Sequence, residues 1–367
     1  MKILLVIDRL TNPHAGTEGQ FLLLIDLLQK AGYELRVVIL ANSDWLSSNP
    51  LPCTTIVIGS SSIKSLKTWW RVYNQARQAK AHGFQLAHIF FNDASVVCPP
   101  VFALAGIKSI ISRRDMGFWY NSIYRAVLPF TGKFVSYVLS NSRAVANVTG
   151  EVERIPESKL RVIYNGFNRT LSAEASVPEL EALKVSGATL FGLVANIRPI
   201  KRMQDAISAL ARLDLTNHNP HLVIIGAGDA TELKALATEL GIGERIHFLG
   251  SRSDIPDCLQ YLSAGLLCSE SEGFSNAIVE YQFAGLPVIC SRTGGNPEAV
   301  TQNQTGWLYE VGDVAELSNA MAAVLNTPEL AKSMGIAAKQ EAESRYTIDA
   351  MLNQHLSLYR ELIGVKS

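Results

Sequence analysis

The chain lacks the residues and segments on which several classes of protein depend. It has five cysteines in 367 residues, with no C-x-x-C pair and no histidines beside them at metal-binding spacing, so we expect neither a zinc site nor a disulfide framework. No apolar run approaches the roughly 20 residues that span a bilayer, and the run in M-K-I-L-L-V-I-D is too short for a signal peptide. These absences predict a cytoplasmic protein in a reducing compartment.

Three common catalytic motifs are also missing. The sequence contains no D-x-D, no H-E-x-x-H and no complete P-loop, so an aspartate pair that holds a divalent cation on a nucleotide is not expected. Positive charge for a bound diphosphate would then come from basic side chains and helix termini. We therefore expect no metal and no cofactor.

The composition is that of a globular protein large enough for two domains. Hydrophobic residues make up 48% of the chain and charged residues 18%, which excludes a disordered chain. Short aliphatic and β-branched runs alternate with longer periodic segments, as in βαβ units around parallel sheets. We expect strands at 3–7, 35–39, 55–58, 87–91, 109–111 and 134–139, and again at 190–195, 221–225, 246–249, 264–267 and 287–290.

A stretch without strand pattern separates these two series of strands. Residues 168–185 are rich in Ser, Ala and Glu and contain Pro178. The predicted fold class is therefore α/β, with two Rossmann-like doubly wound parallel-sheet domains that face each other across a cleft, where such folds bind ligands. The expected divisions are a first domain at 1–168, a linker at 169–187, a second domain at 188–346, and a C-terminal helix within 347–367 that packs back on the first domain.

The charge is distributed unevenly between the two halves. Residues 1–168 hold 18 Lys and Arg against 10 Asp and Glu, whereas the remainder holds 15 against 23. Much of the basic excess lies in residues 63–80, where basic and aromatic residues alternate in an expected helix. This pattern suits the surface of an anionic membrane, but a solvent-exposed helix that buries Leu66, Trp69 and Tyr73 explains it equally well. No nucleic-acid-binding motif accompanies these residues, so we expect no nucleic-acid partner.

The most informative stretch is 268–298, C-S-E-S-E-G-F-S-N-A-I-V-E-Y-Q-F-A-G-L-P-V-I-C-S-R-T-G-G-N-P-E. Glu272 opens a short loop with Gly273, Ser275 and Asn276 can cap a helix, and Glu280 follows in that helix. Free amides and the positive end of the helix dipole at such a start suit a phosphate. Two carboxylates beside it indicate a nucleotide whose diphosphate carries a hydroxyl-rich group such as a sugar.

A second group of polar residues follows the strand expected at 190–195. Asn196, Arg198, Lys201 and Arg202 come directly after it, and Pro199 stiffens their loop. Three cations at the end of a buried strand are well placed to neutralise a diphosphate leaving group. Charges on a solvated loop are the alternative interpretation.

Two glycine-containing turns are weaker signals. Gly16 gives the backbone before the first helix freedom to approach a ligand, with Thr17 and Glu18 at the helix start, although a plain turn also uses glycine. Gly226 and Gly228 form only half of a dinucleotide fingerprint, since the third glycine is absent. A tight turn explains them equally well, so we expect no nicotinamide cofactor.

Polar residues also follow two strands of the first half. Arg113, Arg114 and Asp115 precede an aromatic cluster in S-R-R-D-M-G-F-W-Y, and arginine beside aromatic faces holds anionic or sugar-like ligands. A structural arrangement of Arg114 and Asp115 is the alternative. His88 lies in another strand of this half and either borders the same site or is a satisfied core residue.

These stretches together resemble the family-four retaining glycosyltransferases, which have the two-domain GT-B fold. The resemblance covers nearly the whole chain, and its most specific motif is Glu-x7-Glu followed by G-L-P-V. The other motifs are A-G-T-E near the start, S-R-R-D-M-G-F-W, N-S-R-A-V, R-V-I-Y-N-G-F, V-A-N-I-R-P-I-K, I-I-G-A-G-D and R-I-H-F-L-G-S-R-S-D-I.

The resemblance implies a role for each matching residue. Glu272, Lys201 and Arg198 form the implied catalytic group, in which Glu272 contacts the donor sugar and Lys201 the departing phosphate. Asn196 stands where the family usually has arginine, and Arg202 where it has glycine. The implied donor-binding residues are Gly16, Asn196, Gly250, Arg252, Gly273, Phe274, Ser275, Asn276, Ala277 and Glu280, and the implied acceptor-side or sugar-side residues are Thr17, Glu18, His88, Arg113, Arg114 and Asp115.

The implied activity is transfer of a sugar from a nucleotide-diphosphate sugar to a glycan or lipid-linked acceptor, with retention of anomeric configuration, in bacterial polysaccharide or glycoconjugate biosynthesis. Two other functions fit the same fold. One is a sugar-nucleotide epimerase or hydrolase, and the other is a non-catalytic nucleotide-sugar-binding subunit. The expected location is the cytoplasm, and the basic helix leaves open a peripheral contact with the inner face of the membrane.

Overall fold

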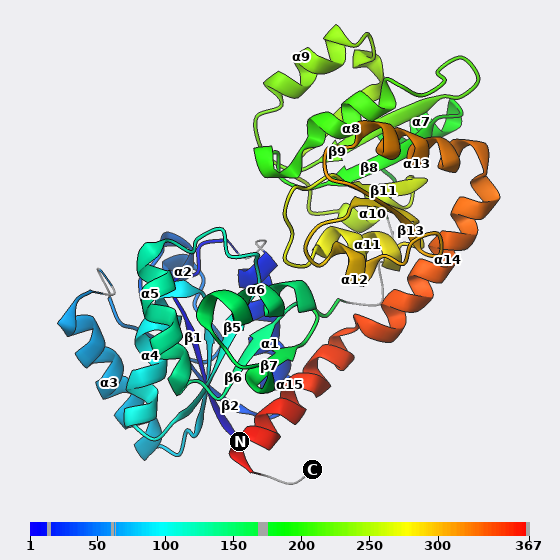
Figure 1. Ribbon diagram of the computed structural model, residues 1–367. Helices are drawn as coiled ribbons and strands as arrows, with labels where there is room; N and C mark the ends of the chain where they lie inside the picture. The colour runs from blue at the N-terminus through cyan, green and yellow to red at the C-terminus, as the bar shows by residue number, and fades with distance from the viewer. Residues whose placement is uncertain (13–15, 60–61, 63, 168–174, 365–367) are drawn as a thin grey trace. The chain divides into compact units, whose positions relative to one another are not determined.

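The computed structural model describes residues 1–12, 16–59, 62, 64–167 and 175–364. The chain divides into two compact units, each built around its own sheet (Figure 1). Unit 1 comprises Met1–Gly166 and Ile348–Ser367, and unit 2 comprises Phe167–Thr347. Among the described residues, no helix is long and apolar enough to cross a membrane.

Unit 1 contains a seven-stranded parallel sheet with the strand order β3-β2-β1-β4-β5-β6-β7. Its central strands are buried on both faces, which explains why they are nearly continuous aliphatic runs. The strands are β1 (Lys2–Ile7), β2 (Glu34–Ile39), β3 (Thr54–Val57), β4 (Leu86–Phe90), β5 (Lys108–Arg113), β6 (Tyr137–Ser140) and β7 (Leu160–Val162).

Helices cover both faces of this sheet. The first face packs against α1 (Gly16–Lys30), α2 (Asp44–Ser48) and α15 (Ile348–Ile363). The other face packs against α3 (Leu66–Ala81) and α4 (Asn92–Leu104). Next to α4 lies α5 (Ser122–Thr131), followed by α6 (Arg143–Glu153), with short 3₁₀ turns at η1 (Gly132–Phe134) and η2 (Glu157–Lys159).

Unit 2 contains a six-stranded parallel sheet with the order β10-β9-β8-β11-β12-β13. Its strands are β8 (Thr189–Val194), β9 (Pro220–Ile225), β10 (Ile246–Gly250), β11 (Ala264–Leu267), β12 (Val288–Ser291) and β13 (Gly306–Tyr309). Its helices are α7 (Pro178–Val185), α8 (Met203–Leu210), α9 (Thr231–Glu239), α10 (Ile255–Leu259), α11 (Asn276–Phe283), α12 (Asn296–Ala299), α13 (Val314–Asn326) and α14 (Pro328–Arg345), with 3₁₀ turns at η3 (Pro199–Lys201) and η4 (Gly243–Arg245).

The two sheets have the same arrangement of strands. Counted within each unit, the first and fourth strands are neighbours at the centre, and the chain moves outward from this pair in opposite directions. The expectation of two doubly wound parallel sheets is confirmed. In such sheets ligands bind beyond the carboxyl ends of that central pair, which are β1 and β4 in unit 1 and β8 and β11 in unit 2.

Two edge strands and one boundary differ from the sequence-based expectation. The strands β7 and β13, with three and four residues, are not among the strands expected from the sequence. The strand expected at 134–139 begins at Tyr137, because the preceding residues form η1. Part of the segment expected as a linker belongs to unit 2, where α7 buries Val177 and Leu180, whereas residues 168–174 lie outside the described residues.

The C-terminal helix α15 is held on unit 1 by buried polar contacts. The Tyr359 hydroxyl lies 2.6 Å from Nδ1 of His88 in β4, and the Lys108 ammonium donates to the Leu362 carbonyl at 2.7 Å. His88 is fully buried, its Nε2 lies 2.7 Å from the Ser112 hydroxyl, and burial lowers its pKa well below the usual value. A neutral His88 thus uses both ring nitrogens inside the core.

We predict that Tyr359→Phe destabilises unit 1, because it leaves a buried nitrogen of His88 without a partner. Such a loss costs about 1–3 kcal/mol in the free energy of unfolding. Tyr137→Phe is the matched control, since its hydroxyl contacts Glu361 of the same helix at the surface. Urea unfolding followed by circular dichroism should give a clearly lower midpoint only for Tyr359→Phe. Equal midpoints for the two variants would show that the His88 contact does not anchor α15.

Candidate active site

The loops that follow β8 and β11 meet at the centre of the unit 2 sheet. The amide of Glu270 donates to the Ile200 carbonyl at 2.9 Å, and the Lys201 ammonium lies 2.5 Å from Oε1 of Glu272. The Ser269 hydroxyl donates to the same oxygen at 2.6 Å. Among the described residues no group contacts Oε2 of Glu272, so one carboxylate oxygen is oriented and left for a ligand.

A third loop, which follows β12, supports the backbone of Glu272. The amide of Gly295 donates to the Glu272 carbonyl at 3.2 Å. Gly294 has a φ of +50°, and a Cβ at this position would lie 1.7 Å from that carbonyl oxygen. Only glycine permits this approach, so Gly294 holds Glu272 in place, a role that sequence reasoning did not assign.

Helix α11 begins beside this ion pair with an open amino end. Ser275 is its N-cap residue, the position expected from the sequence, but its side chain makes no capping hydrogen bond. The amides of Gly273, Ser275 and Ala277 donate to no other group in the described part of the chain. A helix start with free amides next to a lysine is an anion-binding arrangement.

The position of α11 is fixed by a buried tyrosine. The Tyr281 hydroxyl accepts from the amide of Val194 at the end of β8 at 2.6 Å and donates to the Leu266 carbonyl in β11 at 3.3 Å. Gly265 makes room for the ring, since a Cβ there would lie 2.2 Å from it. The same side chain therefore binds the two central strands to the helix whose amino end faces their loops.

Glu280 is the second carboxylate beside this helix start. It is half-buried, and no hydrogen bond or ion pair joins it to the other described residues. Burial raises its pKa from 4.5 to about 7. A carboxyl group in this state can accept or donate a hydrogen bond near neutral pH, which suits a hydroxyl-bearing ligand.

The basic group after β8 contains three cations, of which Lys201 and Arg202 are paired with acids and Arg198 is not. Arg198 is exposed, and its side chain has no hydrogen-bond or ion-pair partner among the described residues. Arg202 pairs with Asp205 at 2.7 Å and has a φ of +46°, the conformation in which glycine is favoured. Asn196 accepts from the Ala227 amide at 3.1 Å, so it joins two turns of the fold.

The turn with Gly226 and Gly228 serves packing between loops. A Cβ at Gly226 would lie 2.0 Å from the Ala195 carbonyl oxygen, and one at Gly228 would lie 2.8 Å from that of Ile197. These glycines therefore bring the turn after β9 against the turn after β8. The geometry matches the tight-turn interpretation.

Gly250 and Arg252 lie next to that turn in unit 2. The Gly250 carbonyl accepts from the Gly226 amide at 2.8 Å. The Arg252 guanidinium is engaged by two acids, with Asp254 at 2.5 Å and Glu179 at 2.7 Å. Arg252 is thus oriented by neighbours within its own unit.

In unit 1 the corresponding helix start is already occupied by a side chain. Asp8, which follows β1, accepts from the amides of Asn92, Asp93 and Ala94 at 3.1, 2.9 and 2.6 Å. Burial raises the pKa of Asp8 to about 7, although these amides act in the opposite direction. Asp8 is not among the residues predicted from the sequence, where its only signal is an acid directly after the first strand.

The Arg113 side chain belongs to a buried structural cluster. Its guanidinium donates to Glu153 at 2.6 Å and to the Ser95 hydroxyl at 2.8 Å, and the Tyr120 hydroxyl donates to the same glutamate at 2.5 Å. The Trp119 ring lies under the guanidinium at 5.2 Å. Arg113 is therefore satisfied inside unit 1 and is not available to a ligand.

The two residues after Arg113 shape the loop that follows β5. Arg114 donates to the Asn165 side chain, and burial lowers its pKa to about 10. Asp115 accepts from the Gly117 amide at 2.7 Å and from the Trp119 indole at 2.8 Å. The alternative interpretation, a structural role, therefore fits Asp115, although Asp115 and Arg114 do not pair.

The remaining acceptor-side candidates lie near the start of α1 or in the core. Gly16 and Thr17 are the first residues of α1, and residues 13–15 lie outside the described residues. Glu18 accepts from the Thr11 amide at 2.9 Å and the Asn12 amide at 2.5 Å, so it holds the preceding loop. His88 is the core residue described above. In the described residues no three His, Cys, Asp or Glu side chains gather as a metal site.

We predict that stability depends on the proton of Glu280. Because its pKa in the folded protein lies above that of an unfolded glutamate, its contribution to stability is full below pH 4.5 and is lost as the pH rises through about 7. Glu280→Gln should therefore melt at a higher temperature than the wild type above pH 7 and at a similar temperature near pH 4.5. Glu232→Gln, on α9, is the control. A difference that does not change with pH would contradict the raised pKa.

Two family models match the chain in adjacent parts. Residues 15–171 match the model described as Glycosyltransferase Family 4, and residues 181–341 match the model described as Glycosyl transferases group 1. The chain is 26% identical over 62% of its length to a Bacillus anthracis protein named N-acetyl-alpha-D-glucosaminyl L-malate synthase, of which the match covers 60%. It is 24% identical to an Escherichia coli UDP-Gal:alpha-D-GlcNAc-diphosphoundecaprenol alpha-1,3-galactosyltransferase, over 74% of this chain and 73% of that protein.

Solved structures share the fold over almost the full length. Anabaena HepE in complex with UDP superposes with a TM-score of 0.86 at 22% identity, covering 99% of this chain and 100% of that one. The same protein with UDP-glucose gives a TM-score of 0.80 at 21% identity, covering 98% and 100%. The two family models together match most of the chain, including the loops that carry Lys201, Glu272 and Glu280. This protein therefore belongs to the family-four glycosyltransferases and has the GT-B fold.

Proposed function

We propose that the protein is a retaining glycosyltransferase that moves a sugar from a nucleoside-diphosphate sugar to a glycan or lipid-linked acceptor. The observation that carries this proposal is the open amino end of α11, which lies between the Lys201–Glu272 pair and the unpartnered Glu280. An anion site flanked by two carboxylates with free hydrogen-bonding capacity matches a diphosphate that has a sugar on each side. No other cluster in the described residues combines these features.

Each group has a distinct role in this proposal. The free amides and the Lys201 ammonium bind the diphosphate and stabilise the charge that develops on the leaving phosphate. Oε2 of Glu272 accepts a hydroxyl of the donor sugar, and Glu280 hydrogen-bonds a hydroxyl of the ribose. Arg198, exposed and without an acidic partner, adds positive charge on the same loop as Lys201.

The proposed chemistry needs no nucleophile from the protein. The bond between the anomeric carbon and the phosphate oxygen breaks, and the acceptor hydroxyl forms the new bond on the same face of the sugar. The acceptor proton passes to the leaving phosphate oxygen. The protein contributes orientation and charge stabilisation, so retention of configuration and independence from divalent metals are both part of the proposal.

The relatives narrow the candidates for donor and acceptor. Two of the superposed structures are titled as complexes with UDP and UDP-glucose, and the Escherichia coli relative is named for a UDP-galactose donor and a diphosphoundecaprenol acceptor. We propose a UDP-sugar donor and an acceptor of the lipid-linked or glycan class, in bacterial glycan biosynthesis. A thermal-shift series with UDP-, GDP- and ADP-sugars should give the largest rise in melting temperature with a UDP-sugar.

We also propose a peripheral contact between unit 1 and an anionic membrane, on the cytoplasmic face. On α3, Leu66 and Trp70 are 86% and 64% exposed beside the exposed Lys64 and Lys67. Exposed aromatic and basic residues in this combination suit a membrane surface. Part of the alternative also holds, since Tyr73 of the same helix packs on the core, but the idea that Leu66 is buried is wrong.

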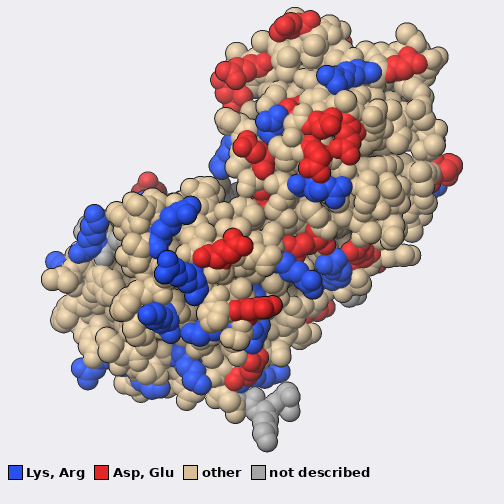
Figure 2. Space-filling model, in the orientation of Figure 1, with Lys and Arg blue, Asp and Glu red and all other residues tan. Residues whose placement is uncertain are grey.

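Basic side chains are spread over the part of the surface that unit 1 forms in Figure 2. Two of the basic residues of α3 hold neighbouring loops instead of facing solvent freely. Arg71 donates to the Ile58 carbonyl at 2.8 Å, and Lys80 donates to the Gly106 carbonyl at 2.7 Å. The proposed contact on α3 therefore depends on the exposed Lys64, Lys67 and Arg77.

We predict that Lys201→Met and Glu272→Gln each lower turnover by about 10²–10³, the loss typical of removing one group that stabilises transition-state charge. The matched controls are Lys234→Met and Glu232→Gln, which make the same two substitutions on α9 of the same unit. Transfer from a labelled UDP-sugar to a lipid-linked acceptor is measured for all four variants. Unchanged turnover in a folded Lys201→Met or Glu272→Gln variant would contradict the assignment.

A nuclear magnetic resonance time course of the products, in the presence of excess EDTA, tests the finer proposals. We expect transfer to continue and the new glycosidic bond to keep the anomeric configuration of the donor. A product with inverted anomeric configuration would refute retention. Loss of turnover when EDTA is added would refute metal independence. Isomerised donor would instead indicate an epimerase, free sugar a hydrolase, and donor binding without turnover across acceptors a non-catalytic subunit.

A further inference from the structure

The exposed apolar side chains of unit 1 are concentrated on one of its two helix layers. Leu66, Trp70, Leu104, Ile123 and Phe130 all belong to α3, α4 or α5. On the opposite layer, the described residues of α1, α2 and α15 include no exposed large hydrophobic residue. Such an asymmetry marks an interaction surface more often than scattered exposure does.

Helix α5 carries an apolar stripe along its length. Ile123 and Phe130 lie two turns apart on one face, and they are 48% and 58% exposed. Phe134 continues the stripe in η1, with its ring 5.5 Å from that of Phe130. The sequence predicts membrane contact only for residues 63–80, and this second apolar face is visible only in the structure.

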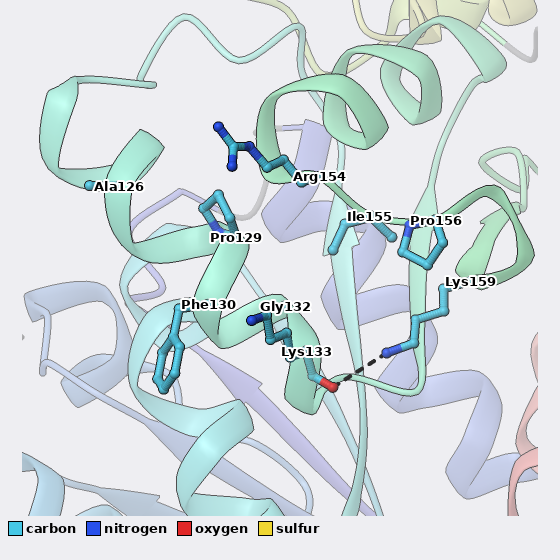
Figure 3. A pocket seen from close by; sticks show the side chains of 9 residues that line it. All are labelled: Ala126, Pro129, Phe130, Gly132, Lys133, Arg154, Ile155, Pro156 and Lys159. Carbon is cyan, nitrogen blue, oxygen red and sulfur yellow. Dashed lines mark hydrogen bonds between the residues drawn. The ribbon is translucent and has the colours of Figure 1, made fainter.

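The stripe ends at a pocket of about 470 Å³ that lies between α5 and the segment after α6 (Figure 3). Three of its nine lining residues are the cations Lys133, Arg154 and Lys159, and none is acidic. Its apolar walls come from both sides, with Phe130 and Pro129 on α5 opposite Ile155 and Pro156. A pocket with this lining matches an anion attached to an apolar group.

The cations differ in how firmly they are held. The Lys159 ammonium donates to the Val135 carbonyl at 2.8 Å and to the Lys133 carbonyl at 3.4 Å, which fixes its position in the wall. Lys133 and Arg154 are exposed, and neither side chain has a hydrogen-bond or ion-pair partner among the described residues. The pocket thus has one oriented donor and two cations free to contact a ligand.

Arg154 also occupies a backbone position that favours a different residue. It ends α6 with φ +54° and ψ +42°, the left-handed conformation in which helices usually place glycine. A non-glycine residue there costs about 1–2 kcal/mol. The backbone conformation therefore does not favour arginine at this position.

The pocket lies at the edge of the unit 1 sheet opposite the carboxyl ends of its strands. It is lined by residues that precede β6 and β7, so it is at the amino ends of these strands. Ligands of doubly wound sheets bind at the carboxyl ends, and six-residue strands such as β5 separate the two edges by roughly 20 Å. The pocket is therefore distinct from the place where an acceptor hydroxyl reacts.

We propose that this pocket binds the phosphate of an anionic phospholipid headgroup, while Ile123, Phe130 and Phe134 enter the boundary of the acyl region. The charge complementarity of an acid-free pocket with three cations, together with the apolar stripe beside it, favours a lipid over a free phosphate. The inference builds on the proposed membrane contact of α3 and adds a defined headgroup site. It makes no use of the nucleotide-sugar site.

The test is cosedimentation of the full chain, without nucleotide and at low salt, with vesicles of equal parts phosphatidylcholine and phosphatidylglycerol. We expect retention of the wild type and about fivefold weaker partitioning of Arg154→Gly, the effect of one surface cation. Glycine fits the positive φ at this position, so the melting temperature should not fall. Arg202→Gly is the matched control for binding, since it removes an arginine at positive φ in unit 2.

Three results would overturn the proposal. One is equal retention of the wild type and Arg154→Gly on the vesicles. If only a Lys64→Gln and Lys67→Gln double variant then loses binding, the membrane contact is made by α3 without the pocket. Another is absence of wild-type retention on anionic vesicles. The third is that glycerol phosphate raises the melting temperature of the wild type while the protein does not bind vesicles. This result would assign the pocket to a free phosphate. Sugar transfer to a soluble acceptor stays unchanged in Arg154→Gly, so failure here leaves the proposed activity intact.

Discussion

In each unit, the capacity to bind an anion depends on whether a side chain already accepts from the amides at the amino end of the helix that follows the fourth strand. In both sheets a helix follows the fourth strand, and its amino end faces the loop after the first strand. In unit 1 that end is filled by Asp8, whose carboxylate accepts from three successive amides of α4. In unit 2 the amides of Gly273, Ser275 and Ala277 at the corresponding end of α11 donate to no group in the described part of the chain. Two sheets with the same strand order therefore differ in their capacity to bind an anion, which is why we propose the diphosphate site in unit 2.

The side chains around α11 act as a set because three loops fix their positions. Lys201 comes from the loop after β8, Glu272 from the loop after β11, and Gly294 from the loop after β12. The ion pair orients Glu272 through one oxygen, leaves the other oxygen free, and places a cation at the helix start. Tyr281 joins the helix to both central strands, so the site depends on the core of unit 2 for its geometry.

The sequence predicted most of the fold, and it named Lys201, Glu272 and Glu280, which the structure brings together in the candidate site. Buried parallel strands are continuous apolar runs, and a glutamate before glycine and a helix start form a local pattern, so both are visible in the sequence. Contacts between segments that are distant in the sequence are not visible in it. The partners of Arg113 and His88, which are Glu153 and Tyr359, lie 40 and 271 residues away, and they turn candidate ligand-binding groups into core residues. Asp8 was missed for the same reason, since its amide partners lie more than 80 residues further along the chain.

The central claim is that the donor diphosphate binds the open helix start of unit 2 and not its filled counterpart in unit 1. Amide hydrogen exchange with and without a UDP-sugar measures both termini in one experiment. The account predicts slower exchange at Gly273, Ser275 and Ala277 on binding, with no change at Asp93 and Ala94, whose amides Asp8 already accepts. Donor binding that leaves residues 273–277 unchanged, or that protects residues 92–94 instead, would contradict it.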